Sequence, residues 1–589
     1  MQIPTRRIEA FVRETVNQCL VSQTERIQRG SLYKNYAMFG AENPSAAAIF
    51  NKTFAYLDDL ESLLYSPVSL RFHIGDPEMP NVLEEAKGRA AASKLRVMAR
   101  RSDTDTMISE AVFWALVYGK TFIKQMWQGG TFYPAYIEPG EMGVMHENHT
   151  ALDQNMEAFV HSTWITPYQF ARRIAKSPDK AKLLQKAKNY TREGKNGMAE
   201  SGASKQIITG GLYPFQASGS ANPNTSRGIV DWLGSPSPTV DATVASSIMR
   251  LDELWVWDDA REDWATFQIV GDDMLIWGKD FIASLFSHNA ANPSEPVSHL
   301  KGKHPFVEFC PNRLPKYFWG RSEIVNVALL QEAINSRING TNKLLRMQED
   351  PPKKFVGGTG VNQNALARFN KPGGYWVEGN PNAKIDAMAP TIPEALWGSL
   401  HEYERMFDEM GGLPPIAKGH GEAGVRSAGH AETLVRMFSP RFKDRALLVE
   451  RDVEALGGIM LDLSRAHIDR KLLAWVPKEQ AGVEAVADNP LLIPPAKGLV
   501  AVPFLFDSLD DEVSLTIDSH SSSPAFAAEA KALVFDLVKT GGMDIATAVE
   551  HLDAPDPDEL IAGITRRQIA AAEAKQEEAR AELLKHTTK

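Results

Sequence analysis

Two histidines near residue 147 are the first side chains of this chain that could do chemistry, and that chemistry would be metal binding. His146 and His149 are three residues apart with Glu147 between them, and on a helix this spacing would bring both imidazoles to one face. The neighbouring Gly143 and Asn148 favour a turn instead. Because short motifs often match by chance, the sequence favours polar turn residues over a metal site.

A second pair of histidines, His420 and His430, lies in and beside a glycine-rich loop. We interpret both as polar loop residues, because nothing around them has the spacing of a metal-ligand set. The sequence therefore predicts no metal ligand.

Nucleotide-binding and nucleophile motifs are missing from the sequence. The glycines of residues 357–360 and 419–421 do not stand in a strand–GxxxxGK[ST]–helix arrangement, and no G-x-S-x-G turn occurs. The acidic residues show no pairing that differs from ordinary surface charge. We expect a chain that is not an enzyme, with no catalytic residue and no cofactor. A soluble multidomain hydrolase that uses His146 or His420 stays open as an alternative.

The most strongly patterned part of the chain begins with a long helix, predicted over residues 320–347. Ser322 is a suitable N-cap, and apolar residues recur from Val327 to Leu345 at helical spacing. The other face is rich in asparagine, a poor helix former whose amides therefore suggest bonds to a neighbour. The candidates for a subunit interface on that face are Asn335, Asn339 and Asn342.

A second helix is predicted over residues 391–412. Thr391 and Glu394 have the spacing of a capping box, and Gly411 and Gly412 are suited to end the helix in a left-handed cap. Residues 348–390, between the two helices, contain strand-like runs at 354–356 and 375–378, which predict a small hairpin-like unit.

A glycine-rich loop follows at residues 413–427, and its basic or titratable side chains include Lys418, His420 and Arg426. A long helix is predicted from about Ala428 towards residue 468, with a kink or break at Pro440.

This order of elements resembles the central region of the portal proteins of tailed bacteriophages, the head-to-tail connectors. The segment FWGRSEIVNVALLQEAINSRINGTNKLL resembles the portal stem helix, and GGLPPIAKGHGEAGVRSAGHAETL resembles the portal tunnel loop. The resemblance implies an α+β portal fold. Its N-terminal part would be a mixed α/β wing at 1–319, with an irregular insertion at about 190–247. Two stem helices at 320–347 and 391–412 would enclose a small α/β clip at 348–390. A tunnel loop at 413–427, a long kinked helix returning to the wing at 428–520, and a helical crown at 521–589 would follow.

The resemblance also implies a function. Twelve copies would form a ring at one capsid vertex, through which double-stranded DNA passes during packaging and ejection. Lys418, His420 and Arg426 would lie nearest the DNA, and Lys343 and Arg346 would line the channel stem. Partners would be the terminase large subunit, head-completion or adaptor proteins, and the major capsid and scaffolding proteins. The chain would reside in the virion, and in the host cytoplasm during assembly.

Outside the central region, the hydrophobic pattern predicts helices at about 6–38, 46–64 and 83–118, and the last of these turns at Gly119 into a strand. Further helices are predicted at 167–175, 526–539 and 544–552. Strands are predicted at 159–165, 253–258, 264–270 and 513–517, with the second and third forming a hairpin around residues 259–263.

Composition limits the class of protein. The 589 residues are 43% hydrophobic and 23% charged, which is typical of a soluble multidomain protein. The two cysteines, Cys19 and Cys310, do not predict a disulfide framework, and no apolar run is long enough for a membrane span. The net charge of −10 argues against a tight duplex binder, although an acidic bore would suit DNA that must slide.

A ring-forming capsid component without DNA contact is the remaining alternative.

Overall fold

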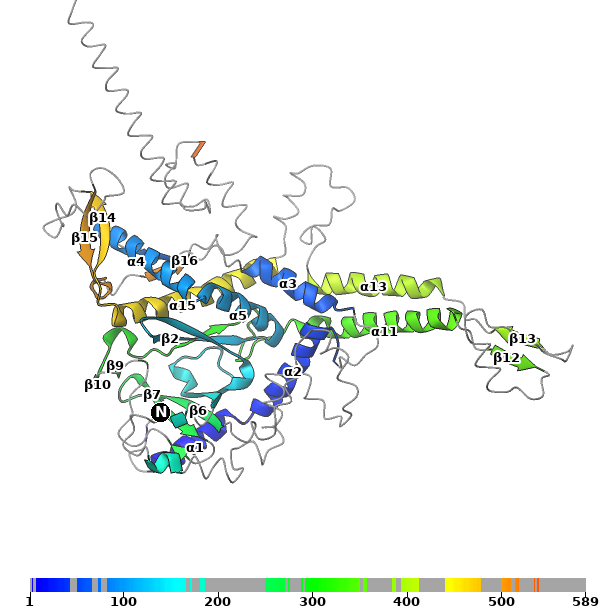
Figure 1. Ribbon diagram of the computed structural model, residues 1–589, viewed down its shortest axis with the longest axis horizontal. Helices are drawn as coiled ribbons and strands as arrows, with labels where there is room; N and C mark the ends of the chain where they lie inside the picture. Colours follow the sequence, from blue (N-terminus) through cyan, green and yellow to red (C-terminus); the bar gives the residue numbers. More distant parts are fainter. Residues whose placement is uncertain are drawn as a thin grey trace, which may run out of the picture. The chain divides into compact units, whose positions relative to one another are not determined.

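The computed structural model describes most of the chain (Figure 1). The described residues are 3, 7–42, 50–65, 72–75, 82–165, 170–171, 181–185, 249–270, 274–275, 286, 288–289, 292–349, 353–356, 384–387, 393–412, 440–477, 499–509, 514–517, 534, 536 and 538–539. They form both helices and antiparallel sheets, so the predicted α+β fold class is confirmed.

The helices are α1 (Ile8–Cys19), α2 (Gln23–Phe39), α3 (Lys52–Leu64), α4 (Val82–Arg101), α5 (Thr104–Tyr118), α11 (Ile324–Glu349), α13 (Glu394–Gly411) and α15 (Pro440–His467). Short 3-10 helices are η2 (Pro139–Glu141), η3 (Gln154–Met156), η6 (Ser298–Leu300) and η7 (Phe506–Ser508). In the part of the chain that the structure describes, no helix combines the length and the apolar character that a membrane crossing requires.

The strands are β1 (Phe72–Gly75), β2 (Thr121–Gln128), β3 (Thr131–Ile137), β4 (Met142–Val144), β5 (Ala158–Ile165), β6 (Met249–Asp258), β7 (Asp263–Val270), β8 (Met274–Leu275), β9 (His288–Asn289), β10 (Asn292–Pro296), β11 (Phe306–Phe309), β12 (Lys353–Val356), β13 (Lys384–Ala387), β14 (Leu472–Pro477), β15 (Leu499–Phe504) and β16 (Ser514–Ile517). The larger sheets have the orders β11-β2-β3 and β4-β5-β6-β7-β8, and two-stranded sheets pair β1 with β16, β9 with β10, β12 with β13, and β14 with β15.

The chain divides into two compact units. The first comprises residues 1–31, 57–323 and 428–589, and the second comprises residues 32–56 and 324–427. The second unit thus holds α11, α13 and the β12–β13 pair together with a segment that the sequence pattern assigned to the N-terminal region.

The first unit has its core between the helix α1 and the five-stranded sheet. Ile8, Val12 and Val16 lie one helical turn apart on α1 and pack against alternate residues of β5, β6 and β7, such as Val160 and Phe267. The strands β6 and β7 form the predicted hairpin, with Asp258 paired to Asp263 at its end. The hairpin prediction is therefore confirmed.

Two glycines allow a close backbone crossing in the first unit. α5 ends at Gly119, which has φ +100° and begins the connection to β2, as the sequence predicted. Gly320 has φ +66°, and a Cβ on it would lie 2.7 Å from both the carbonyl oxygen of Gly119 and the sulfur of Cys310. Only glycine fits both positions without strain, and this crossing lies directly before α11 begins.

Three predictions differ from the structure. The N-cap of α13 is Pro393 and no side chain caps it, so the capping box of Thr391 and Glu394 is wrong; Thr391 itself lies outside the described residues. The partner of β12 is β13 at Lys384–Ala387, whereas the predicted strand at 375–378 lies outside the described residues. The segment predicted as one helix at 6–38 is broken between α1 and α2. The kink or break predicted at Pro440 stays a prediction, because α15 begins at Pro440 and the residues before it lie outside the described chain.

Other predictions fall partly or wholly outside the described residues. These are the insertion at 190–247, most of the helix at 167–175, the glycine-rich loop, and nearly all of residues 521–589. The C-terminal cap of α13 is confirmed, because Gly412 has φ +73° in the left-handed region.

Candidate functional site

The predicted site residues do not all fall in the described chain. Lys418, His420 and Arg426 lie outside it, so their proximity to DNA stays a prediction. Lys343 and Arg346 lie on the last turns of α11 and are exposed. These two cations are available to a charged partner.

The asparagines of α11 are used in different ways. Asn342 is exposed and Asn339 is half-buried, and their interface role stays a prediction. Asn335 is only 3% exposed, and its side-chain amide donates to the carbonyl of Gly40 at 2.7 Å. Its amide oxygen also accepts from the backbone of Phe50. The placement of Asn335 at a subunit interface is therefore corrected: its amide bonds within its own chain.

Gln331 explains why residues 50–53 belong to the second unit. Its side chain is fully buried one helical turn before Asn335, and its amide group donates to the carbonyl of Phe50 at 2.7 Å. The amide oxygen accepts from the backbone of Lys52 and Thr53, which start α3. Buried polar groups are costly unless bonded, so this cluster fixes the start of α3 against α11. The sequence pattern places Gln331 on the polar face of the helix, opposite its apolar stripe.

The helices α11 and α13 lie side by side in the second unit (Figure 1). The guanidinium of Arg337 lies 5.8 Å from the ring centroid of Tyr403. Tyr56 of α3 donates to the carbonyl of Gly411 at 3.1 Å, and its ring meets Phe407 edge-on with centroids 5.9 Å apart. A Cβ on Gly411 would lie 2.8 Å from the tyrosine ring, so this contact requires glycine.

Exposed apolar side chains gather on the second unit. It carries nine of the fourteen large hydrophobic residues found exposed in the described chain, although it is the smaller unit. They are Met38, Phe50, Phe54, Val325, Leu329, Leu345, Trp397, Met406 and Met410, and Leu329 is the most exposed at 84%. Exposed apolar side chains in this number favour contact with another molecule.

A groove of about 500 Å³ runs along α11 beside α13. Ser336, Gly340, Leu344 and Met347 line it from α11, Leu396 lines it from α13, and the cations Arg337 and Lys343 complete its wall. A Cβ added at Gly340 would have no atom within 4 Å. The groove is thus lined by apolar and basic side chains, and at Gly340 no side chain fills it.

The His146–His149 segment forms a turn, as the sequence predicted, because the backbone of His149 donates to the carbonyl of His146. Both imidazoles line an open hollow of about 520 Å³ together with Glu157 and Asp259. The imidazole of His146 lies 3.8 Å from the carboxylate of Glu157. Within the described residues, however, no cluster of three ligand side chains could hold a metal ion.

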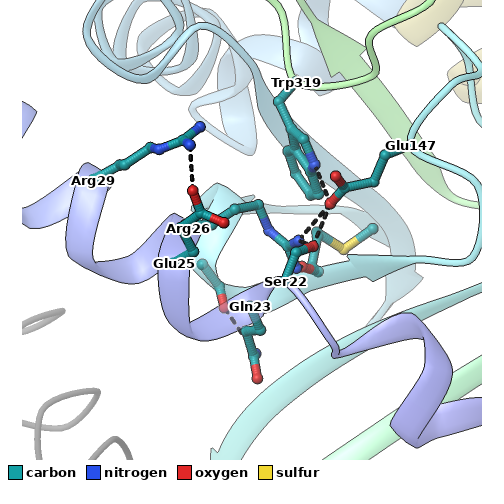
Figure 2. A network of polar contacts seen from close by, with 9 residues as sticks. Ser22, Gln23, Glu25, Arg26, Arg29, Glu147 and Trp319 are labelled. Carbon is teal, nitrogen blue, oxygen red and sulfur yellow. Dashed lines mark hydrogen bonds and ion pairs between the residues drawn. The ribbon is translucent and has the colours of Figure 1, made fainter.

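Glu147, the acidic residue between the histidines, is committed to a different network (Figure 2). One of its carboxylate oxygens accepts from Arg26 of α2 at 2.9 Å, from the indole of Trp319 at 2.9 Å, and from Ser22. The Arg26 guanidinium also lies 4.2 Å from the centroid of the Trp319 ring. Glu147 therefore fixes the residues before α11 within the first unit.

Ion pairs buried in the first unit join its sheets and helices, and no local sequence pattern predicts them. Lys124 of β2 bonds Glu253 of β6 at 2.6 Å, which links the two larger sheets. Burial alone would raise the pKa of Glu253, but Lys124, His161 and Trp255 together lower it to about 2. Burial raises the pKa of Asp452 on α15 to about 7, although it is paired with Arg313.

Comparison with known proteins gives little guidance. No family model matches the sequence, and no curated protein matches it. Among solved structures, one described as the neck of an empty GTA particle, computed with C6 symmetry, is similar over 90% of this chain and 94% of that chain. The TM-score is 0.35 and the identity 11%, values too low to support an inference about this chain.

Proposed function

We propose that this chain is a portal subunit, of which twelve copies form a ring at one vertex of a bacteriophage capsid. The observation that carries the proposal is the second unit. It is a pair of long helices joined through a small strand pair, with the interior polar groups satisfied and many apolar side chains exposed. Such a unit needs a partner, and further copies of the chain are the partner that a ring supplies.

The order of elements supports the same proposal. A helix, a strand pair and a second helix follow one another at α11, β12–β13 and α13, as the resemblance to portal proteins implies. In the ring, α11 and α13 form the wall of a channel for double-stranded DNA. The β12–β13 region is the docking site for the terminase large subunit and later for head-completion proteins.

The proposed mechanism requires no bond chemistry in this chain. A net charge of −10 keeps most of the surface from adhering to DNA phosphates, so the polymer slides. Contact is restricted to a few cations, for which Lys418 and Arg426 of the loop are the candidates, with His420 beside them. The protein resides in the virion and contacts capsid and scaffolding proteins during assembly.

The loop assignment is tested by replacing Lys418 and Arg426 by alanine in particles assembled with this chain. The amount of DNA retained per particle should change while the rings stay intact, because the phosphate contacts are lost without loss of subunit contacts. Lys471→Ala, an exposed cation of the first unit, is the matched control and should leave DNA content unchanged. Unaltered DNA content in the loop variant would show that this loop is not the contact.

A further inference from the structure

The groove beside Gly340 and the exposed Trp397 lie on different sides of the same helix pair. Leu396 lines the groove, and Trp397 follows it about 100° further around α13. Leu400 and Phe407 lie between these two directions, at about 40° and 20° from Leu396, and Phe407 is fully buried. Trp397 therefore lies about 100° around α13 from the residue that lines the groove, and the buried Phe407 lies on the side of Leu396.

The same division holds on α11. Gly340 and Leu345 are five residues apart, which places Leu345 about 140° around the helix from the groove. Leu345 is 39% exposed and Trp397 is 47% exposed. One side of the helix pair thus carries the groove. Another side carries the exposed apolar side chains of Leu345 and Trp397.

The groove and Trp397 also lie at the same level along the helices. α11 and α13 run in opposite directions, and Leu396 reaches the groove between Ser336 and Met347. Trp397 is adjacent to Leu396, so it lies within the length of α11 that lines the groove, from Ser336 to Met347. In a ring whose axis runs along the helices, equal levels in one copy are equal levels in every copy.

The charges of the two sides are complementary. Arg337 and Lys343 line the groove, and no acidic side chain does. On α13, Glu394 lies three residues before Trp397 and Glu404 seven residues after it, so both share its face. An approaching copy would bring these carboxylates to the basic wall of the groove.

Gly340 has no role that the single chain explains. It lies inside α11, where glycine costs helix stability relative to alanine, and its backbone conformation does not require glycine. A Cβ would meet no atom within 4 Å. A glycine that leaves a hole in a helix surface suits a bulky side chain approaching from outside.

We propose that the indole of Trp397 of one copy inserts into the groove at Gly340 of the next copy. The inference rests on the proposed function and names the contact that joins neighbouring subunits. Because groove and indole lie on different sides of one helix pair, each copy can use both at once. Such a heterologous contact continues from copy to copy and closes into a ring when the rotation allows it.

A cysteine cross-link tests the contact directly. Gly340→Cys and Trp397→Cys are made separately, and the two proteins are mixed under mild oxidation. We expect a disulfide-linked dimer only in the mixture, and a ladder of multimers from the double variant. The natural Cys19 and Cys310 are buried and free, so they do not contribute. Absence of cross-linking in the mixture, with rings present, would overturn the contact.

Filling the groove gives a second test. Gly340→Leu adds a side chain where the single chain has open space and where leucine is a better helix former, so the subunit should remain folded. We expect loss of rings and a species of 65.1 kDa. Gly458→Leu, at a helical glycine of α15 that also has open space, is the control and should keep its rings.

The two proposals fail differently. If the unaltered protein forms rings and Gly340→Leu leaves them intact, the Trp397 contact is wrong while the portal proposal stands. If the unaltered protein forms no rings at any concentration, the portal proposal itself fails. An exchange of charges tests the Trp397 contact separately. Lys343→Glu and Glu394→Lys should each weaken ring assembly, and the double variant should restore it.

Discussion

At the scale of single residues, this chain is held together by buried polar groups that its sequence pattern does not reveal. The sequence places Gln331 and Asn335 on the polar face of α11, which we interpreted as a contact with a neighbouring subunit. Both are buried because backbone groups at Gly40 and Phe50 bond to them. Which amides become buried depends on a segment some 285 residues away, and periodicity contains no information about it.

The pH dependence of stability should reveal Glu253. Its pKa falls from 4.5 to about 2 on folding, so its contribution is present above pH 4.5 and is lost as the pH falls towards 2. Glu253→Gln should therefore lower the free energy of unfolding by about 3 kcal/mol at pH 7, taking about 1.4 kcal/mol per pKa unit. Urea unfolding at pH 7 and at pH 3 measures this difference.

The difference between Glu253→Gln and the unaltered protein should shrink at pH 3, because the carboxyl of the unfolded chain is then protonated. Glu262→Gln is the control, since the Glu262 side chain is 80% exposed. An equal loss of stability at both pH values would mean that the ion pair with Lys124 does not stabilise the fold.

At the scale of elements, local patterns predicted well and long-range pairing did not. The hairpin of β6 and β7, the passage from α5 through Gly119 to β2, and the end of α13 at Gly412 follow from turn residues and periodicity within a few positions. The partner of β12 was misplaced because about thirty residues separate the two strands, and several short runs in that interval have similar strand propensity.

The glycine crossing before α11 predicts a sharp effect of one methyl group. Gly320→Ala must accommodate a Cβ 2.7 Å from the carbonyl oxygen of Gly119, at a positive φ that disfavours alanine. We expect the free energy of unfolding to fall by about 2 kcal/mol or more. Gly458→Ala, at an open helical position, should instead raise it by about 0.5–1 kcal/mol. Thermal or urea unfolding of the two variants compares them.

If Gly320→Ala proves as stable as the unaltered protein, α5 and the residues before α11 are not packed as closely as described. The crossing would then not fix the position from which α11 begins.

At the scale of the whole molecule, the sequence predicted the α+β class and the order helix, strand pair, helix of α11, β12–β13 and α13. It could not indicate which surfaces are apolar and exposed, because exposure depends on what the rest of the chain covers. The main finding that the structure adds to the sequence is the concentration of exposed hydrophobic residues on the second unit. It turns a resemblance in element order into a specific proposal about which surfaces join copies of the chain.

Electron microscopy of the purified 589-residue chain in negative stain shows whether its copies assemble into rings. We expect closed rings with a central hole, each built from twelve subunits of 65.1 kDa. We expect no rings from the Gly340→Leu variant. Fields of single particles of one-subunit size at every protein concentration would contradict the portal proposal.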